Sequence, residues 1–186
     1  MSRFTVTGLP LLDLKLIERQ RLGDSRGFLS RLFCAEELAA AGWRQPIAQV
    51  NHTVTAQRGT VRGMHYQQPP HAEMKLVTCI RGEVWDVAVD LRAGSPTFLH
   101  WHAEGLSADN NRALLIPEGF AHGFQTLTDD VTLLYCHTAT YSPEAERALN
   151  AQDPRLSITW PLAITALSSR DVTHPLLDMK FEGLQL

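Results

Sequence analysis

From residue 47 to residue 137, short apolar runs alternate with clusters of turn-forming residues. The runs are rich in β-branched and aromatic residues, whereas the segments between them carry glycine, proline, aspartate and asparagine, as is typical of strands joined by turns. The clearest runs are KLVTCI (75–80), EVWDVAVDL (83–91), RALLIP (112–117), FQTLT (124–128) and VTLLYCHT (131–138). Because the runs are short and closely spaced, they predict an all-β protein built as an antiparallel sandwich or barrel.

The two-residue period of a strand is clearest within EVWDVAVDL. Its alternate residues from Trp85 to Leu91 are all apolar, whereas Asp86 and Asp90 lie on the opposite face,. We therefore expect the first face to pack in the core and the second to carry the acids. A solvated or turn-bonded carboxylate is the favoured interpretation of Asp86, and a place in a binding site is the alternative.

One compact helix is predicted in the first half of the chain. The segment CAEELAAAG (34–42) is rich in alanine and unbranched residues, and Gly42 is a suitable residue to end the helix,. No repeat, low-complexity tract or linker interrupts the 186 residues, so a single domain over 1–186 is expected,. The 44% hydrophobic and 20% charged content is ordinary for a globular protein,.

The charge and the termini limit the partners and the compartment. A net charge of −3 gives no general attraction to nucleic acid or to an anionic membrane, so neither is an expected partner,. Acidic residues and a proline break the apolar run in residues 1–21, so neither a signal peptide nor a membrane anchor is expected and the predicted location is cytoplasmic,. Cys34, Cys79 and Cys136 lack CxxC spacing, which favours reduced thiols over disulfides or a zinc site,.

Residues able to carry chemistry gather in a few segments. They are RGMHYQ (62–67), Lys75, the PEGFAHGF turn (117–124), LLYCHTATYSP (133–143) and LSSRD (167–171). A histidine beside a pocket is the usual general base near neutral pH when a carboxylate fixes its tautomer. The sequence alone does not place Asp171 beside His65, and a single histidine is more often structural.

The order and spacing of these segments resemble the dTDP-4-dehydrorhamnose 3,5-epimerase family, from Asp24 to Asp178. The similarity is carried by RGTVRGMHYQ, KLVTCIRGEVWDVAVDLRAGSPTF, LSADNNRALLIPEGFAHGF, LLYCHTATYSPEAE and LSSRDVTHPLLD. The resemblance implies a cupin-type jelly-roll barrel with short peripheral helices, usually dimeric, with a pocket inside it. It also implies inversion of carbons 3 and 5 of a nucleotide-linked 4-keto-6-deoxy sugar through an enolate, without a metal or an organic cofactor.

The resemblance implies roles for individual residues as well. His65 matches the base, Asp171 the carboxylate paired with it, and Tyr135 the acid on the opposite face of the sugar. Lys75 is the candidate for stabilising the enolate oxygen, because a lysine opening an apolar strand can point its ammonium group into a pocket. The implied contacts to the nucleotide sugar are Arg26, Gln49, Asn51, Arg62, His122 and Tyr141. For Arg26, a surface turn is the alternative.

Two other functions stay open. The run HWHAE places His100, His102 and Glu104 on one side of a strand, so a metal-binding cupin is an alternative, although a surface or interface position is favoured for both histidines,. Relatives with the same pocket invert one carbon only, and other cupins acting on similar sugars move the ketone between carbons 3 and 4.

The nucleotide is a separate question, because this chain differs from the family pattern near the DSRGF turn. Family members that use dTDP commonly carry an aromatic residue before this turn and a glutamate after it, where this chain has Leu22 and Arg31. Thr140 also replaces the first of two adjacent tyrosines. One hypothesis is altered base recognition, with CDP or another nucleotide in place of dTDP. The alternative is drift within a dTDP enzyme.

Overall fold

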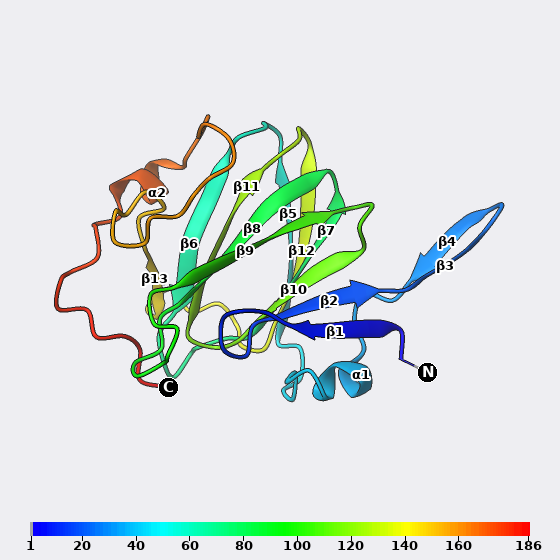
Figure 1. Cartoon of the computed structure of the whole chain (residues 1–186), viewed down its shortest axis with the longest axis horizontal. Coiled ribbons are helices and arrows are strands. Elements are labelled where there is room, and N and C mark those ends of the chain that lie inside the picture. Colours follow the sequence, from blue (N-terminus) through cyan, green and yellow to red (C-terminus); the bar gives the residue numbers. More distant parts are fainter. Residues whose placement is uncertain (1) are drawn as a thin grey trace.

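The computed structural model describes residues 2–186, which form two antiparallel β-sheets packed face to face (Figure 1). The six-stranded sheet comprises, in spatial order, β1 (Phe4–Gly8), β2 (Lys15–Arg19), β10 (Arg112–Ile116), β7 (Lys75–Arg81), β12 (Val131–His137) and β5 (Gln49–Thr55). The five-stranded sheet comprises β13 (Glu146–Ala148), β6 (Val61–Gln67), β11 (Phe120–Thr126), β8 (Glu83–Asp90) and β9 (Trp101–Ser107). The all-β jelly roll is confirmed, as two sheets that are not joined into a closed barrel.

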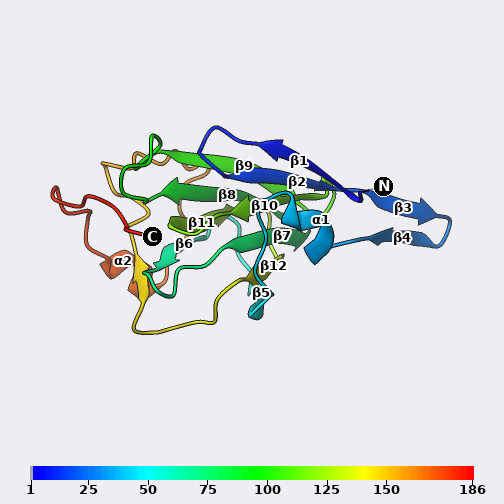
Figure 2. The same cartoon turned by 90° about the horizontal axis from the view of Figure 1, so that it is seen from below.

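A hairpin and two short helices lie outside the sheets. The hairpin of β3 (Arg21–Asp24) and β4 (Gly27–Ser30) projects from one end of the molecule, and α2 (Ser169–Thr173) lies at the opposite end (Figure 2). Helix α1 (Ala35–Ala39) confirms the helix predicted in residues 34–42, although it is shorter. Gly42, at φ 112°, has the backbone conformation that favours glycine and follows the helix as expected,.

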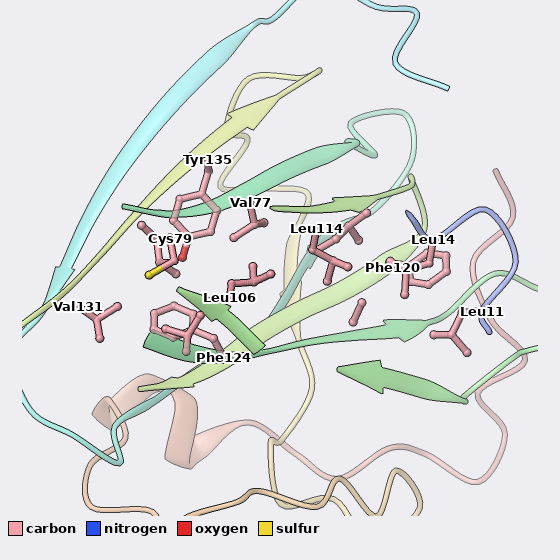
Figure 3. Close-up of a cluster of buried hydrophobic side chains, with 14 residues drawn as sticks. Leu11, Leu14, Val77, Cys79, Leu106, Leu114, Phe120, Phe124, Val131 and Tyr135 are labelled. Carbon is pink, nitrogen blue, oxygen red and sulfur yellow. The ribbon is translucent and has the colours of Figure 1, made fainter. Parts of the chain in front are cut away.

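The core between the sheets is formed by apolar side chains from both of them (Figure 3). The six-stranded sheet contributes Val77, Leu114 and Leu133, and the five-stranded sheet contributes Leu106 and Phe124. These side chains alternate with residues on the outer faces, as the pleat requires. Toward the end of the molecule that carries α2, this apolar core gives way to a polar pocket between the same two sheets.

The outer face of the five-stranded sheet is also covered, which the strand period alone did not predict. Val87 and Val89 pack in a second apolar cluster with Leu149 and Leu156, which follow the last strand in the chain. Strand β8 is therefore buried on both faces beyond its first residues, and Asp86 and Asp90 lie inside the protein rather than on its surface. Asp90 is turn-bonded, because its carboxylate accepts hydrogen bonds from Arg92, Ser95 and Thr97.

The outer face of the six-stranded sheet is covered only in part. Leu38 of α1 and Trp43 pack on Ile17 and Leu115 of this sheet. Other apolar side chains of the molecule are exposed, among them Val50 and Val54 of the edge strand β5, Ile80 of β7, and Phe28 and Leu29 of the hairpin. Among residues 2–186, no helix combines the length and the apolar content needed to cross a membrane.

Candidate active site

A cavity of about 560 Å³ opens between the two sheets near α2. Eight of the ten residues predicted for the site line it: Asn51, Arg62, His65, Lys75, His122, Tyr135, Tyr141 and Asp171. These residues come from both sheets, from the loop between β12 and β13 and from the C-terminal segment, so the fold assembles them from distant parts of the chain.

Strand pairing explains why these side chains share one pocket. His65 on β6 lies directly opposite His122 on β11, and cross-strand partners point to the same face of a sheet,. Tyr135 on β12 and Lys75 on β7 lie on neighbouring strands of the facing sheet. His122 was predicted in a turn, but the turn ends at Gly119 and the histidine is within β11. The pocket therefore has histidines on one wall and a tyrosine and a lysine on the other.

His65 and Asp171 form a hydrogen-bonded pair, with Nε2 of the histidine 2.8 Å from Oδ1 of the aspartate. The backbone N–H of Asp171 donates to Oγ of Ser168, the residue that caps α2. Burial alone would raise the pKa of Asp171, but the hydrogen bond and charge of His65 together with Ser168 hold it below its usual value. The aspartate side chain is 4% exposed and the histidine 37%, so the carboxylate is sequestered while the imidazole reaches the pocket.

Tyr135 lies between two further histidines, each paired with a carboxylate. The ring of His122 meets it edge-on at 5.8 Å, and the ring of His137 stacks on it at 6.0 Å. His122 Nε2 is 2.8 Å from Asp86 Oδ1, and His137 Nδ1 is 3.0 Å from Glu73 Oε2. Burial raises the pKa of the Tyr135 phenol, and the nearby charge of Asp86 raises it further. The phenol is therefore protonated at neutral pH and able to donate.

The favoured interpretation of Asp86 as a solvated or turn-bonded carboxylate is wrong. Asp86 is fully buried and its partner is His122. The sequence showed an acid on one strand face but not that this face lies between the sheets. Glu73 and His137 were not singled out at all, because their contact joins residues 64 apart and follows no local pattern.

Glu73 also holds Lys75 in place. The Lys75 ammonium is 3.1 Å from Glu73 Oε1 and donates to the backbone carbonyl of His65 at 3.4 Å. Burial would raise the pKa of Glu73, but His137 and Lys75 lower it below the usual value. An ammonium group has three N–H donors, so one of them is left for a ligand in the pocket.

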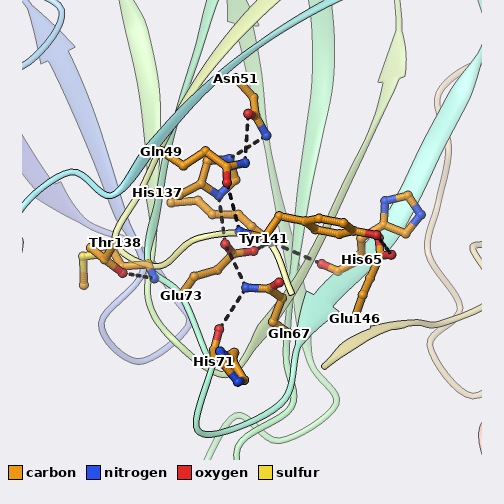
Figure 4. Close-up of polar contacts among 12 residues, drawn as sticks. Gln49, Asn51, His65, Gln67, His71, Glu73, His137, Thr138, Tyr141 and Glu146 are labelled. Carbon is orange, nitrogen blue, oxygen red and sulfur yellow. Dashed lines mark hydrogen bonds and ion pairs between the residues drawn. The ribbon is translucent and has the colours of Figure 1, made fainter. Parts of the chain in front are cut away.

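The mouth of the pocket is held together by polar contacts (Figure 4). Gln49 donates to Asn51 at 2.9 Å and accepts the backbone N–H of Tyr141 at 2.9 Å, while the Tyr141 hydroxyl donates to Glu146 at 2.7 Å. Gln49, predicted to contact the substrate, is not among the residues that line the cavity and instead orients two that do. Arg170, which the sequence did not suggest, lines the cavity and pairs with Glu146.

Arg26 does not reach the pocket of its own chain. It follows Asp24 at the tip of the β3–β4 hairpin, where its side chain is 87% exposed and pairs with that aspartate. The hairpin points away from α2 (Figure 1), whose residues line the pocket. Leu22 and Arg31, the positions that differ from the family pattern, lie on and just after this same hairpin. Within one chain, Arg26 therefore lies in a surface turn, which was the alternative to its predicted contact with the substrate.

The three ligands of the metal-binding alternative are not brought together. His100 precedes β9 and is exposed, whereas His102 and Glu104 are bonded to each other at 2.9 Å. In the part of the chain that the structure describes, the group of side chains close enough to share a metal ion is His65, Asp171 and His174.

The geometry of the pocket suits proton transfer at carbon. It places a histidine backed by a buried carboxylate on one sheet, and a protonated tyrosine and an ammonium group on neighbouring strands of the facing sheet. A base and an acid on opposite walls can remove a proton from one face of a bound molecule and return one to the other face. The ammonium group can stabilise the negative charge that develops in between.

Comparison with known proteins agrees with this arrangement. A family model described as dTDP-4-dehydrorhamnose 3,5-epimerase matches residues 8–179. The dTDP-4-dehydrorhamnose 3,5-epimerase of Sinorhizobium fredii is 43% identical over 170 residues, covering 91% of this chain and 87% of that protein.

Two solved structures are also similar. One is dTDP-6-deoxy-D-glucose-3,5-epimerase of Legionella pneumophila in complex with dTDP-4-keto-L-rhamnose, with a TM-score of 0.91, 37% identity and coverage of 98% of this chain and 99% of that one. The other is a 3'-monoepimerase from Streptomyces bikiniensis in complex with dTDP-quinovose, with a TM-score of 0.85, 38% identity and coverage of 90% and 85%. The similar proteins thus include both double and single epimerases.

Proposed function

Because this chain belongs to the dTDP-4-dehydrorhamnose 3,5-epimerase family and is an epimerase of nucleotide-linked sugars, we propose that its pocket inverts carbons 3 and 5 of dTDP-4-keto-6-deoxyglucose. The ketone at carbon 4 acidifies the hydrogens on both neighbouring carbons. Loss of one as a proton leaves an enolate, and return of a proton from the opposite face inverts the carbon. The observation that supports this proposal most directly is the placement of His65 and Tyr135 on facing sheets around one pocket.

In this proposal His65 is the base. Its Nε2 is engaged by Asp171, so Nδ1 is the nitrogen that accepts the proton from carbon,. The electron pair of the broken C–H bond moves toward the carbon-4 oxygen, where Lys75 stabilises the charge. Tyr135 then donates its phenolic proton to the opposite face of the carbon. Asp171 stabilises the imidazolium formed on His65 and takes no proton itself.

The remaining pocket residues bind the substrate. Arg62 and Asn51 are assigned to the diphosphate and the nucleoside, because a protein of net negative charge needs local donors to hold an anionic ligand,. His122 is assigned to oxygens of the sugar, and Tyr141 to the mouth of the pocket. Arg170 is a further cation of the cavity lining, held by Glu146.

We propose dTDP as the nucleotide, and the Legionella pneumophila structure with dTDP-4-keto-L-rhamnose supports this choice. The competing hypothesis of altered base recognition rests on Leu22 and Arg31. Competition binding with dTDP, CDP, UDP and GDP separates the two. A preference for dTDP of about tenfold, roughly 1.4 kcal/mol, is expected, and equal affinities would favour the altered-base hypothesis.

We also propose that the active form is a homodimer in which the β3–β4 hairpin reaches the pocket of a second copy. Phe28 and Leu29 are exposed on the hairpin, and Val50 and Val54 are exposed on the edge strand β5. Exposed apolar residues on a projecting hairpin and a free sheet edge are characteristic of interfaces. Such pairing would give Arg26 a phosphate to bind. A cytoplasmic location is proposed as well, supported by three free cysteines,.

Deuterium exchange tests the proposed function. The protein is incubated with dTDP-4-keto-6-deoxyglucose in D₂O, and deuterium at carbons 3 and 5 is followed by NMR. Incorporation at both carbons is expected, and His65→Ala should slow it by about a hundredfold to ten-thousandfold. His100→Ala, an exposed histidine just before β9 and outside the cavity lining, is the matched control. Incorporation at carbon 3 alone would establish a single epimerase, and unchanged exchange in His65→Ala would refute its role as base.

A further inference from the structure

His174 stands directly behind the pair of His65 and Asp171. Its Nε2 is 3.8 Å from Asp171 Oδ1, and its ring meets the His65 ring edge-on at a centroid distance of 6.3 Å. One nitrogen from each histidine and one carboxylate oxygen all lie within 4.8 Å of one another. His174 is outside the cavity lining, and its Nε2 is buried with no hydrogen-bond partner. A buried polar atom without a partner requires an explanation.

Two imidazole nitrogens and a carboxylate oxygen are a common ligand set for zinc and related transition metals. Tetrahedral zinc with bonds of about 2.0–2.1 Å places its ligand atoms roughly 3.3 Å apart, so the present spacing needs only small side-chain movements. Asp171 is buried and held at the start of α2, while His65 faces the cavity. A bound ion would thus have three protein ligands and an open position toward the pocket.

We propose that His65, Asp171 and His174 form a binding site for a divalent transition-metal ion such as Zn²⁺, and that the bound ion inhibits the epimerase. The inhibition rests on the proposed function, whereas the binding does not. An ion on Nε2 of His65 replaces the hydrogen bond to Asp171. A neutral imidazole bound to metal through Nε2 carries its proton on Nδ1, so Nδ1 can no longer accept a proton from carbon.

Metal binding is tested on untagged full-length protein treated with a chelator and then titrated with ZnCl₂ by calorimetry, with Co²⁺ absorption as a second probe of coordination. The variant is His174→Phe, which retains a ring beside His65 but removes the ligand. His102→Phe is the matched control, because His102 also bonds a carboxylate but lies outside the group. His174→Asn is the second variant if phenylalanine lowers the melting temperature.

One Zn²⁺ per chain is expected in the unmodified protein and in His102→Phe, with at least a tenfold loss of affinity in His174→Phe. Zinc should inhibit deuterium exchange in the unmodified protein at concentrations that leave His174→Phe active. Absence of stoichiometric binding, or equal affinity in His174→Phe, would overturn the inference. Zinc binding that depends on His174 in a protein without exchange activity would support the site and refute the proposed function.

Discussion

Replacement of Asp171 by asparagine removes the charge behind His65 while keeping the shape of the side chain. At 2.8 Å, the attraction between a carboxylate and an imidazolium is about 1.5 kcal/mol with the dielectric constant of water and about 6 kcal/mol at an effective value of about 20,. The aspartate is buried and the histidine is partly open to solvent, so the loss falls between these limits. Since about 1.4 kcal/mol changes a rate tenfold, we expect exchange to slow by about tenfold to ten-thousandfold.

The assay is the rate of deuterium incorporation at carbons 3 and 5, measured at saturating substrate for Asp171→Asn, His65→Ala and the double variant. Because Asp171 acts only through His65, the double variant should be no slower than His65→Ala. Asp178→Asn, an exposed carboxylate of the C-terminal segment, is the control for a change of charge. A rate within twofold of the unmodified protein for Asp171→Asn, or effects that multiply in the double variant, would refute the assignment.

Three other outcomes are expected. Tyr135→Phe should slow inversion at carbon 5 by about a hundredfold or more while exchange initiated by His65 continues, and full epimerisation measured by NMR would mean that another acid serves. The Arg26→Ala and His65→Ala proteins should each have low activity alone and regain part of it when they are mixed. The reason is that a mixed dimer has one pocket that contains both Arg26 and His65. No gain of activity on mixing would contradict the exchange of hairpins. Asp90→Asn should cost about 3 kcal/mol of unfolding free energy at pH 7. The folded pKa of Asp90 is held low, against burial, by its bonds to Arg92, Ser95 and Thr97, so its contribution is present above the unfolded pKa of about 3.9 and is lost as pH falls through the folded value. The difference in melting temperature between Asp90→Asn and the unmodified protein should therefore be much larger at pH 7 than at acid pH. A difference that does not change with pH would contradict an ionic origin of the stabilisation by Asp90.

The sequence predicted the strands well because each run carries its own periodicity and is bounded by turn residues. No local pattern predicts the pairing of His65 with Asp171, because the two residues are 106 apart in the chain. Only the resemblance to a family suggested their contact. The structure places them 2.8 Å apart. Their catalytic roles stay predictions until the variants are measured.

Other features could not be predicted because they depend on which segments cover each face. The alternation in EVWDVAVDL identified two faces of β8 correctly but not that both are buried, so Asp86 was assigned to the wrong environment. The hairpin sequence indicated a turn at Arg26 but not the direction in which the hairpin extends. His174 carried no signal of its own, and its nearness to Asp171 follows from the short helix α2.

The C-terminal segment both covers the five-stranded sheet and carries Asp171, the proposed partner of the base. Every strand of both sheets precedes Asp171 in the chain, so the sheets can pair during synthesis before this carboxylate emerges from the ribosome. Until residues 149–184 have been synthesised, the apolar face around Val87 and Val89 lacks its full cover and is a surface on which chaperones or other nascent chains can bind,. The contact between His65 and Asp171 closes a loop of 106 residues. Contacts of such long sequence separation carry an entropic cost and form late in folding. Recovery of activity on refolding should accordingly lag behind formation of the sheets.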